Sequence, residues 1–358
     1  MSSKPIRAAV LGVGFSATVF QIPFILGLPD QFKLHSILER RATKEQSKAR
    51  DLYGHTGVKV VTTYDDVLQD PEVDLVVVSI RSPEHFAYTK AALEAGKHVI
   101  LEKPVTATSA DMRELTALAK SKQLVLAPYH NRRFDGDFRT VRALIKDGKL
   151  PDLIDFESRF DVLANWPMGL PGTGSGISYG LGTHLLDQVI ALFGKPKSVT
   201  AMLINARGIG HPEVEDSFIL HLRYVDSPVI VTLRSVMHSV MSKQVRFVAR
   251  SLNASYVKYG LDVQADQLMQ QSMKATDSGF GEEPKEKWGE YGRLVDGKQI
   301  FEKIPTHTGS YLDYYRNVGE AIRGVAQLEV TPEDAELGIR IIEVARQSSQ
   351  EGRTIEFE

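Results

Sequence analysis

Small residues recur at a fixed spacing near the start of the chain, in the pattern Gly12-x-Gly14-x-x-Ala17. They lie between an apolar run that is typical of a strand and a segment of helical character. At such a junction the first glycine permits a tight turn, the second lets the backbone approach a pyrophosphate, and the third small residue lets the helix pack against the strand. Free N–H groups at the helix N-terminus favour phosphate. We therefore expect Gly12, Gly14, Phe15, Ser16 and Ala17 to bind a dinucleotide, although a glycine turn without a ligand has the same pattern.

Charged residues follow the second expected strand, in the stretch "ILERRATK". Glu39 stands where an acid accepts hydrogen bonds from the adenosine ribose of NAD(H). Arg40 and Arg41 come next, and guanidinium groups suit the 2′-phosphate of NADP(H) because they form bidentate, charge-assisted bonds. The two signals conflict. We favour NADP(H), bound by the arginines, over NAD(H), while a solvated basic turn would read neither.

Alternating strand and helix patterns over the first third of the chain must position these residues. Residues 73–80 form an almost continuous apolar run, which is typical of a strand covered on both faces. Glu102-Lys103-Pro104 closes a later strand at the carboxyl edge of the sheet, where open α/β folds bind ligands. Ser79 and Glu102 are therefore expected cofactor contacts. The βαβ rhythm predicts a Rossmann dinucleotide-binding domain over residues 1–128.

The rest of the chain, residues 129–358, has longer strand patterns that follow one another closely. Apolar and polar residues alternate in "FILHLRY", as in a strand with one solvated face. We expect an α+β domain with a large, mostly antiparallel, open-faced sheet, and an α/β protein overall. A terminal helix is expected to begin with Thr331 as its N-cap and Pro332 at its first position. Residues 272–300 are rich in glycine and charge, and they are expected to form a long surface excursion.

Composition excludes several classes of function. The length of 358 residues suits two domains, and a net charge of −2 gives no basic field for nucleic acid or an anionic membrane. No apolar run approaches the roughly 20 residues that cross a bilayer, and no signal peptide is recognised, so we expect a cytoplasmic protein. Cysteine is absent, which rules out disulfides and thiolate catalysis. His211, His221 and His238 lack metal-ligand spacing, so no metal is expected.

Several stretches together resemble the Gfo/Idh/MocA family (glucose–fructose oxidoreductase, inositol dehydrogenase and rhizopine catabolism proteins). The resemblance covers essentially the whole chain. It rests on "GVGFSATVFQIP", "ALEAGKHVILEKP", "YHNRRFDGDF", "GTHLLDQVIALFG", "SYVKYG" and "VTPEDAELGIRIIE". The third and fifth of these look most like the NADP-dependent scyllo-inositol dehydrogenase branch, without fixing a substrate.

This resemblance implies a catalytic role for Lys103, because the matching lysine of the family faces both the nicotinamide and the substrate hydroxyl. The chemistry is consistent with that role. Hydride leaves carbon only as the hydroxyl loses its proton, so a proton donor–acceptor must lie at that oxygen. A partly desolvated lysine beside an oxidised nicotinamide would have a lowered pKa. Lys103 is thus expected to touch both cofactor and substrate, and Pro104 to follow a cis bond.

The resemblance also marks a second active-site segment, residues 172–188. His184 matches the family's catalytic histidine, and Asp187 follows one helical turn later. The usual aspartate four residues before the histidine is replaced by Gly180. Tyr179 or Asp187 could substitute for it, the site could accept another substrate, or activity could be lost. A histidine that merely caps the core is the structural alternative for His184.

Other polar residues at element ends complete the expected site. Asn131 and Arg132 follow a strand end and could donate hydrogen bonds to substrate oxygens, or could equally be structural. Ile80-Arg81 replaces the Thr-Pro found in many family members. Arg81 could reach an anion, but a solvent-facing side chain is the favoured interpretation.

Together these features predict an oxidoreductase that transfers hydride reversibly between NADP(H) and a hydroxyl or carbonyl carbon of a small polyol, inositol or sugar. The alternatives are a regulatory protein that binds the cofactor without turnover, and an imine or double-bond reductase. The resemblance implies a homodimer or homotetramer formed through the C-terminal sheet.

Overall fold

The computed structural model describes residues 4–172 and 174–357 of the chain. They form two compact units. The first contains residues 4–131, 265–280 and 310–335, and the second contains residues 132–264, 281–309 and 336–357. The sequence-based division after residue 128 does not include the two later segments that return to the first unit.

The first unit is built on a six-stranded sheet in the order β3-β2-β1-β4-β5-β6. All of its strand pairs are parallel, as the βαβ rhythm predicts. The order reverses between β1 and β4, and open α/β sheets bind ligands at such a switch point. The strands are β1 (Ile6–Leu11), β2 (Phe32–Leu38), β3 (Lys59–Val61), β4 (Leu75–Val78), β5 (His98–Leu101) and β6 (Leu126–Pro128).

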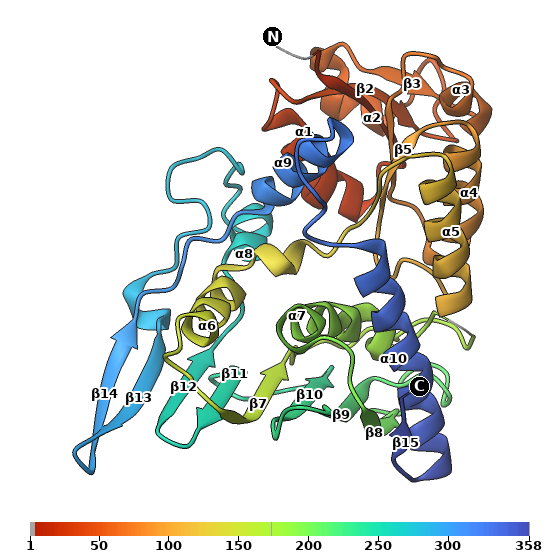
Figure 1. The fold of residues 1–358 in the computed structure, drawn as a ribbon. Helices are drawn as coiled ribbons and strands as arrows, with labels where there is room; N and C mark the ends of the chain where they lie inside the picture. The colour runs from red at the N-terminus through yellow and green to blue at the C-terminus, as the bar shows by residue number, and fades with distance from the viewer. Residues whose placement is uncertain (1–3, 173, 358) are drawn as a thin grey trace. The chain divides into compact units, whose positions relative to one another are not determined.

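Helices cover both faces of this sheet, with α4 and α5 on one face and α1 and α9 on the other (Figure 1). Short polar caps start several of them: Thr63 and Asp66 form a reciprocal capping box on α3, and the Thr108 side chain caps α5. The helices are α1 (Ile22–Leu26), α2 (Lys48–Tyr53), α3 (Tyr64–Leu68), α4 (His85–Glu94), α5 (Ser109–Ser121), α8 (Gln264–Met269) and α9 (Tyr311–Ile322).

Helix α9 belongs to the core of the first unit because its tyrosines are buried among N-terminal aromatic side chains. The ring of Tyr315 lies 6.1 Å from that of Phe24 and 5.7 Å from that of Phe32. Tyr314 packs edge-on against Tyr129, with 4.9 Å between ring centres. Aromatic pairs at these distances add stabilisation beyond the area they bury. The return of this late segment is therefore a packing requirement of the first unit.

The second unit is built on a nine-stranded sheet in the order β14-β13-β12-β11-β7-β10-β9-β8-β15. Only the β7–β10 pair is parallel among the described strands of this sheet, so the expected, mostly antiparallel architecture is confirmed. The strands are β7 (Leu153–Arg159), β8 (Ser198–Ile204), β9 (Ser217–Arg223), β10 (Ile230–Val236), β11 (Val245–Ser251), β12 (Ala254–Tyr259), β13 (Gly289–Val295), β14 (Lys298–Ile304) and β15 (Ile355–Glu356).

The expectation of a surface excursion over residues 272–300 is wrong for its last part. Strands β13 and β14 form a hairpin that extends the sheet at one edge, and β13 also pairs with β12. Asp296 and Gly297 make the turn with φ values of 50° and 74°. Left-handed backbone at both positions matches the right-handed twist of the flanking strands, and Asp-Gly is a favoured sequence for such a turn.

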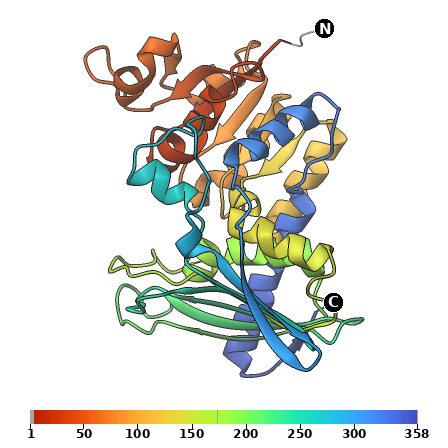
Figure 2. The ribbon, with the colours of Figure 1, turned by 90° about the vertical axis from the view of Figure 1, so that its left-hand side faces the viewer.

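Three helices complete the second unit: α6 (Gly136–Lys146), α7 (Thr183–Phe193) and most of α10 (Pro332–Glu351). Helices α6 and α7 lie on the same face of the sheet (Figure 2). The Thr331 hydroxyl accepts a hydrogen bond from the backbone N–H of Asp334 at 3.1 Å, which confirms the expected cap of α10. None of the helices in the described part of the chain is long and apolar enough to span a bilayer.

A buried guanidinium ties α6 and α7 to this sheet. Arg246 of β11 is 1% exposed and pairs with Asp137 of α6 at 2.9 Å. It also donates to the Ser158 hydroxyl at 3.0 Å and to the side-chain oxygen of Gln188 in α7 at 2.7 Å. Removal of one partner would leave the other charge buried without compensation, which costs far more than the loss of an exposed pair.

We expect Asp137→Ala to destabilise the second unit by about 3–5 kcal/mol, because it leaves the buried Arg246 charge unpaired. The control is Asp155→Ala, which removes the partner of the exposed Arg250 and should cost less than about 1 kcal/mol. Urea unfolding followed by circular dichroism measures both. Equal losses in the two variants would contradict the structural role of the buried pair.

Candidate cofactor and substrate site

Glycine is present at two positions of the turn after β1 for different structural reasons. Gly12 has φ = +99°, and a Cβ there would lie 3.0 Å from the carbonyl oxygen of Ser79, so only glycine fits without strain. Gly14 has no such backbone constraint, and a Cβ there would meet no atom within 4 Å. The space beside Gly14 is therefore open to a ligand, as the dinucleotide pattern predicts.

An open groove of about 880 Å³ begins at this turn. Its walls follow the carboxyl ends of β1, β2 and β4, the strands that flank the switch point of the sheet. Three arginines lie among the lining residues, which are Gly12, Val13, Leu38, Glu39, Arg40, Arg41, Ile80, Arg81, Pro83, Glu84 and Tyr88. The groove thus unites the glycine turn with the predicted basic residues and includes Arg81, which is exposed, in agreement with the favoured solvent-facing interpretation.

Ser79 supplies a direct test of fit for a dinucleotide. Its hydroxyl oxygen is buried at the carboxyl end of β4, and within the described residues it has no hydrogen-bond partner. Buried hydroxyls are ordinarily hydrogen-bonded, so this one suits a partner that a bound cofactor brings. The open space beside Gly14 points the same way.

Glu39 is engaged in capping a helix. Its carboxylate accepts hydrogen bonds from the Ser47 hydroxyl at 2.6 Å and from the backbone N–H groups of Lys48 and Ala49 at 3.0 Å each. Burial alone would raise the pKa of Glu39, but these hydrogen bonds together lower it below its usual value. The acid that was expected to bind ribose therefore stabilises the start of α2, and much of its accepting capacity is already used.

The two arginines after β2 have different surroundings. Arg40 is exposed and lies 3.2 Å from the carboxylate of Glu84, across the groove. Arg41 is also exposed, and within residues 4–172 and 174–357 no ion pair or hydrogen bond of its guanidinium is found. Arg41 is thus the more available of the two for an anionic ligand.

Glu102 joins the end of β5 to the segment after the glycine turn, which contains Ser16 and Gln21. This residue is 5% exposed. Its carboxylate accepts hydrogen bonds from the side-chain amide of Gln21 at 2.7 Å, from the Ser16 hydroxyl, and from the backbone N–H of Lys103 at 3.0 Å. Gln21 in turn accepts a hydrogen bond from the Tyr315 hydroxyl of α9. Glu102 and Ser16, both predicted to contact cofactor, are therefore partners of one another.

Lys103 follows directly and is half-buried. The peptide bond between Lys103 and Pro104 is cis, as expected. A half-buried ammonium group at the carboxyl end of a parallel strand is suited to proton exchange, because it is partly desolvated yet reachable by a ligand.

The second active-site segment belongs to the second unit and forms a π-helical turn, Ser178–Gly182, that runs into α7. Such turns are frequent at functional sites. Tyr179 is buried with the guanidinium of Arg346 4.9 Å from its ring centre, and burial raises the pKa of Tyr179 to about 12. At Gly180 a Cβ would lie 3.5 Å from the terminal methyl of Met168, an ordinary contact, so the backbone there tolerates a Cβ.

His184 is buried in the first turn of α7, with its ring centre 6.4 Å from that of Phe160. Arg132 also lies over the Phe160 ring: its guanidinium carbon is 4.6 Å from the ring centre, and it pairs with Asp135 at 3.1 Å. His184 and Arg132 thus share Phe160 as a neighbour.

Asp187 is held by a guanidinium that the sequence analysis did not single out. Arg133 binds both of its carboxylate oxygens, at 2.5 and 3.0 Å, and both side chains are buried. Asn131, at the end of the first unit, is buried as well. Arg133 adjoins Arg132 in the sequence, and nothing in the sequence pattern separates the two. Their ion-pair partners differ, because Arg133 binds Asp187 of α7 and Arg132 binds Asp135. The roles of Asp187 and Asn131 toward substrate stay predictions.

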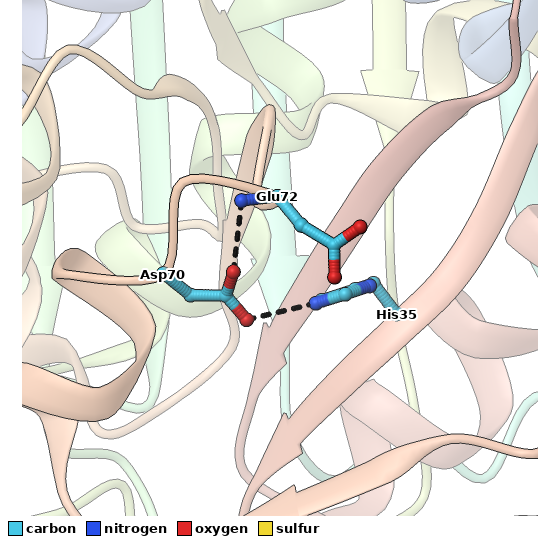
Figure 3. A group of neighbouring side chains, drawn as sticks. All are labelled: His35, Asp70 and Glu72. Carbon is cyan, nitrogen blue, oxygen red and sulfur yellow. Dashed lines mark hydrogen bonds and ion pairs between the residues drawn. The ribbon is translucent and has the colours of Figure 1, made fainter.

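One group in the described part of the chain has the donor types of a metal site: His35, Asp70 and Glu72 (Figure 3). His35 and Asp70 are 2.9 Å apart, and the ammonium group of Lys59 lies 3.6 Å from Asp70 and 3.4 Å from Glu72. A cation therefore already balances these acids. Asp70 and Glu72 precede β4, whereas the groove follows the carboxyl ends of β1, β2 and β4, and none of the three residues lines it.

The chain matches two family models. Residues 6–130 match the oxidoreductase family, NAD-binding Rossmann fold, and residues 142–357 match the oxidoreductase family, C-terminal alpha/beta domain, both of the Gfo/Idh/MocA group. The chain belongs to this family of oxidoreductases. The family expected from the sequence motifs is thereby confirmed, and with it an NAD(P)-binding oxidoreductase.

Several known proteins align with this chain over nearly its full length. It is 40% identical to an uncharacterised oxidoreductase, C115.03, of Schizosaccharomyces pombe, over 99% of this chain and 100% of the relative. It is 36% identical to the scyllo-inositol 2-dehydrogenase (NADP(+)) IolW of Bacillus subtilis, over 99% and 96%. A solved oxidoreductase of Bacillus subtilis, yvaA, superposes with a TM-score of 0.91 at 34% identity, over 99% of both chains.

The glycine turn gives a prediction that separates folding from binding. Gly14→Ala should leave the free energy of unfolding within about 0.5 kcal/mol of the unsubstituted protein, because its Cβ has open space. The same methyl should weaken the binding of NADPH and of NADH at least about tenfold, since it occupies the path of the pyrophosphate. Fluorescence titration and thermal unfolding measure the two effects.

Gly12→Ala is the matched control, and it should destabilise the protein by about 1–3 kcal/mol because of its left-handed backbone. Unchanged cofactor binding by Gly14→Ala would show that this turn does not carry the pyrophosphate.

Proposed function

We propose that this oxidoreductase transfers hydride reversibly between NADP(H) and a hydroxyl or carbonyl carbon of a small polyol, inositol or sugar. The observation that carries the proposal is the half-buried Lys103 at the carboxyl end of β5, tethered through Glu102 to the glycine turn. The printed names of two relatives support the substrate class: the scyllo-inositol dehydrogenase of Bacillus subtilis and, over 44–54% of this chain, sugar reductases such as 1,5-anhydro-D-fructose reductase of Ensifer adhaerens.

The cofactor, when bound, supplies or accepts the hydride at its nicotinamide ring. Lys103 exchanges the accompanying proton: its ammonium form donates to a carbonyl oxygen that becomes a hydroxyl, and its neutral form accepts the proton in the reverse direction. Ser79, Gly12 and Gly14 bind the dinucleotide along the carboxyl edge of the sheet. Glu102 acts by orienting Lys103 and the helix that follows the glycine turn.

Further residues are assigned to the substrate on the basis of their sequence pattern; all but Asn131, which ends the first unit, belong to the second unit. We assign His184 to the reacting oxygen, and Asn131, Arg132 and Tyr179 to other substrate oxygens. Asp187 orients Arg133 through its two buried hydrogen bonds. Gly180 leaves unfilled the space of the usual aspartate, which favours a substrate that brings a larger group to this position.

The preference for NADP(H) rests on the surroundings of the groove's charged residues. Glu39 has committed its carboxylate to α2, which weakens its claim on the ribose hydroxyls. Arg41 is available to a 2′-phosphate, whereas Arg40 is shared with Glu84. Glu84 carries a negative charge on the same groove and would repel the phosphate, so the preference is a balance between Arg41 and Glu84.

We also propose that a second copy of the chain covers the sheet of the second unit. Met202 and Ile204 of β8 and Ile230 of β10 are exposed apolar side chains on neighbouring parts of that sheet. By register through β9 these side chains share one face of the sheet, and exposed apolar side chains on an open sheet face favour association.

The proposed chemistry predicts that Lys103→Met lowers kcat by at least about a thousandfold, because no other group at this position can exchange the proton. The dissociation constant of NADPH should stay within about threefold, since the groove is unchanged. Stopped-flow absorbance at the nicotinamide band, over a panel of inositols, aldoses and cyclic imines, measures turnover, and fluorescence titration measures binding.

Lys103→Arg is the control for charge: it keeps a cation but cannot act as a proton acceptor, so it should also be inactive. Full activity in Lys103→Met would refute the assigned role. Bound NADPH with no hydride transfer to any compound of the panel would favour a regulatory protein instead, and activity on imines alone would favour an imine reductase.

Cofactor preference gives a further prediction. Arg41→Ala should weaken NADPH by about 10–100-fold and NADH by less than about threefold, because one charge-assisted hydrogen bond to the 2′-phosphate is lost. Glu84→Gln should strengthen NADPH severalfold, since it removes a repulsive charge and releases Arg40. Equilibrium titration with both cofactors measures these effects.

Lys44→Ala is the matched control, because Lys44 is an exposed cation of the same turn that does not line the groove. Equal losses of NADPH and NADH in Arg41→Ala would mean that Arg41 does not read the 2′-phosphate.

A further inference from the structure

The imidazole ring of His85 lies between two backbone carbonyl groups near the proposed site. His85 is the first residue of α4 and is 1% exposed. Its Nδ1 lies 2.8 Å from the carbonyl oxygen of Pro104, and its Nε2 lies 3.2 Å from the carbonyl oxygen of Ile80. Pro104 follows Lys103, and Ile80 lines the groove. One buried ring therefore contacts the backbone next to the proposed proton donor and the backbone of the proposed cofactor groove.

The two contacts impose a chemical constraint on the ring. Carbonyl oxygens only accept hydrogen bonds, and a neutral imidazole donates through one nitrogen alone. Burial lowers the pKa of His85, although the two carbonyl groups and the nearby carboxylate of Glu102 oppose that change. At neutral pH the ring therefore donates to one carbonyl, and the shorter distance assigns the proton to Nδ1 and the bond to Pro104.

We propose that His85 is a positioning residue for Lys103, and that it acts through the hydrogen bond from Nδ1 to the Pro104 carbonyl. That carbonyl belongs to the residue after Lys103, so holding it restrains the backbone from which the Lys103 side chain extends. Nothing in the sequence pattern assigned a role to His85. The proposal rests on the proposed function, because Lys103 must be the proton donor–acceptor for its orientation to matter.

Two amide substitutions separate the ring nitrogens. The side-chain N–H of Asn lies where Nδ1 lies in His, whereas that of Gln lies where Nε2 lies. His85→Asn should therefore keep the bond to Pro104, His85→Gln should keep only the contact with Ile80, and His85→Leu should keep neither. If the role of His85 were merely structural, His85→Asn and His85→Gln should have similar effects on Lys103 and on turnover, since each variant loses one contact.

The first readout needs no substrate. Reductive methylation with ¹³C-formaldehyde labels the lysines of the full chain, and the signal missing in Lys103→Arg identifies Lys103. With NADPH bound, we expect the chemical shift and titration midpoint of Lys103 to match the unsubstituted protein in His85→Asn and to be displaced in His85→Gln and His85→Leu.

The second readout is turnover of the compounds on which the panel shows activity. His85→Asn should keep kcat within about threefold, and His85→Gln and His85→Leu should lose at least about tenfold, because small displacements of a reacting group are costly. KM for NADPH should change less than about threefold in all of them. Substitutions of His98 serve as the control, since this half-buried histidine, at the opposite end of β5 from Lys103, accepts a hydrogen bond from Val125 N–H at 3.0 Å.

The outcomes separate the two proposals. An unchanged Lys103 signal in His85→Leu, or equal effects of Asn and Gln, overturns the role of His85. Full activity in Lys103→Met overturns the proposed function instead, whatever the His85 variants do. Loss of activity in Lys103→Met together with normal activity in His85→Leu overturns the positioning role alone.

Discussion

The hydrogen bonds of one buried carboxylate, that of Glu102, hold the first unit's chemistry together. Glu102 directly follows β5, and its carboxylate accepts hydrogen bonds from Ser16 and Gln21 in the segment after the glycine turn and from the backbone N–H of Lys103. A carboxylate that accepts several hydrogen bonds while buried is fixed in place, because each of its partners would otherwise be left unsatisfied. The glycine turn and the lysine are thereby registered against each other before any ligand binds.

This registration extends to a distant part of the chain. Gln21 accepts a hydrogen bond from Tyr315, whose ring packs between Phe24 and Phe32. Helix α9 is therefore both a piece of the core and a support for the Glu102 network. Preorganised groups need no rearrangement when the reaction occurs, which is where much of an enzyme's rate enhancement originates. The packing of a late helix thus contributes to the geometry of residues that precede it by about two hundred positions in the chain.

The sequence predicted what local patterns determine. The glycine spacing predicted a turn with open space at Gly14, and the alternation of elements predicted the parallel sheet. It did not predict which polar groups form hydrogen bonds with one another. Glu39 has the right position for a ribose contact, but its bonds to the start of α2 depend on how the following loop folds. The hairpin around Asp296 and Gly297 carried a local signal that was outweighed by the charge of its surroundings. The return of α9 carried none, because its apolar face does not specify its partner.

The two acids that line the groove, Glu39 and Glu84, differ in the groups that already bind them. Glu39 stays ionised, because hydrogen bonds from Ser47, Lys48 and Ala49 lower its pKa, but the same bonds use much of its capacity to accept hydrogen bonds from ribose. Glu84 has one partner, Arg40, and that pair is exposed to solvent, where an ion pair contributes little free energy. Under the proposed preference for NADP(H), an entering 2′-phosphate would compete with Glu84 for Arg40 at small cost, while Arg41 would bind it without giving up a partner in the described structure. The selectivity of the groove is thus set by the differences among its charged residues in what already binds them, rather than by the number of charges alone.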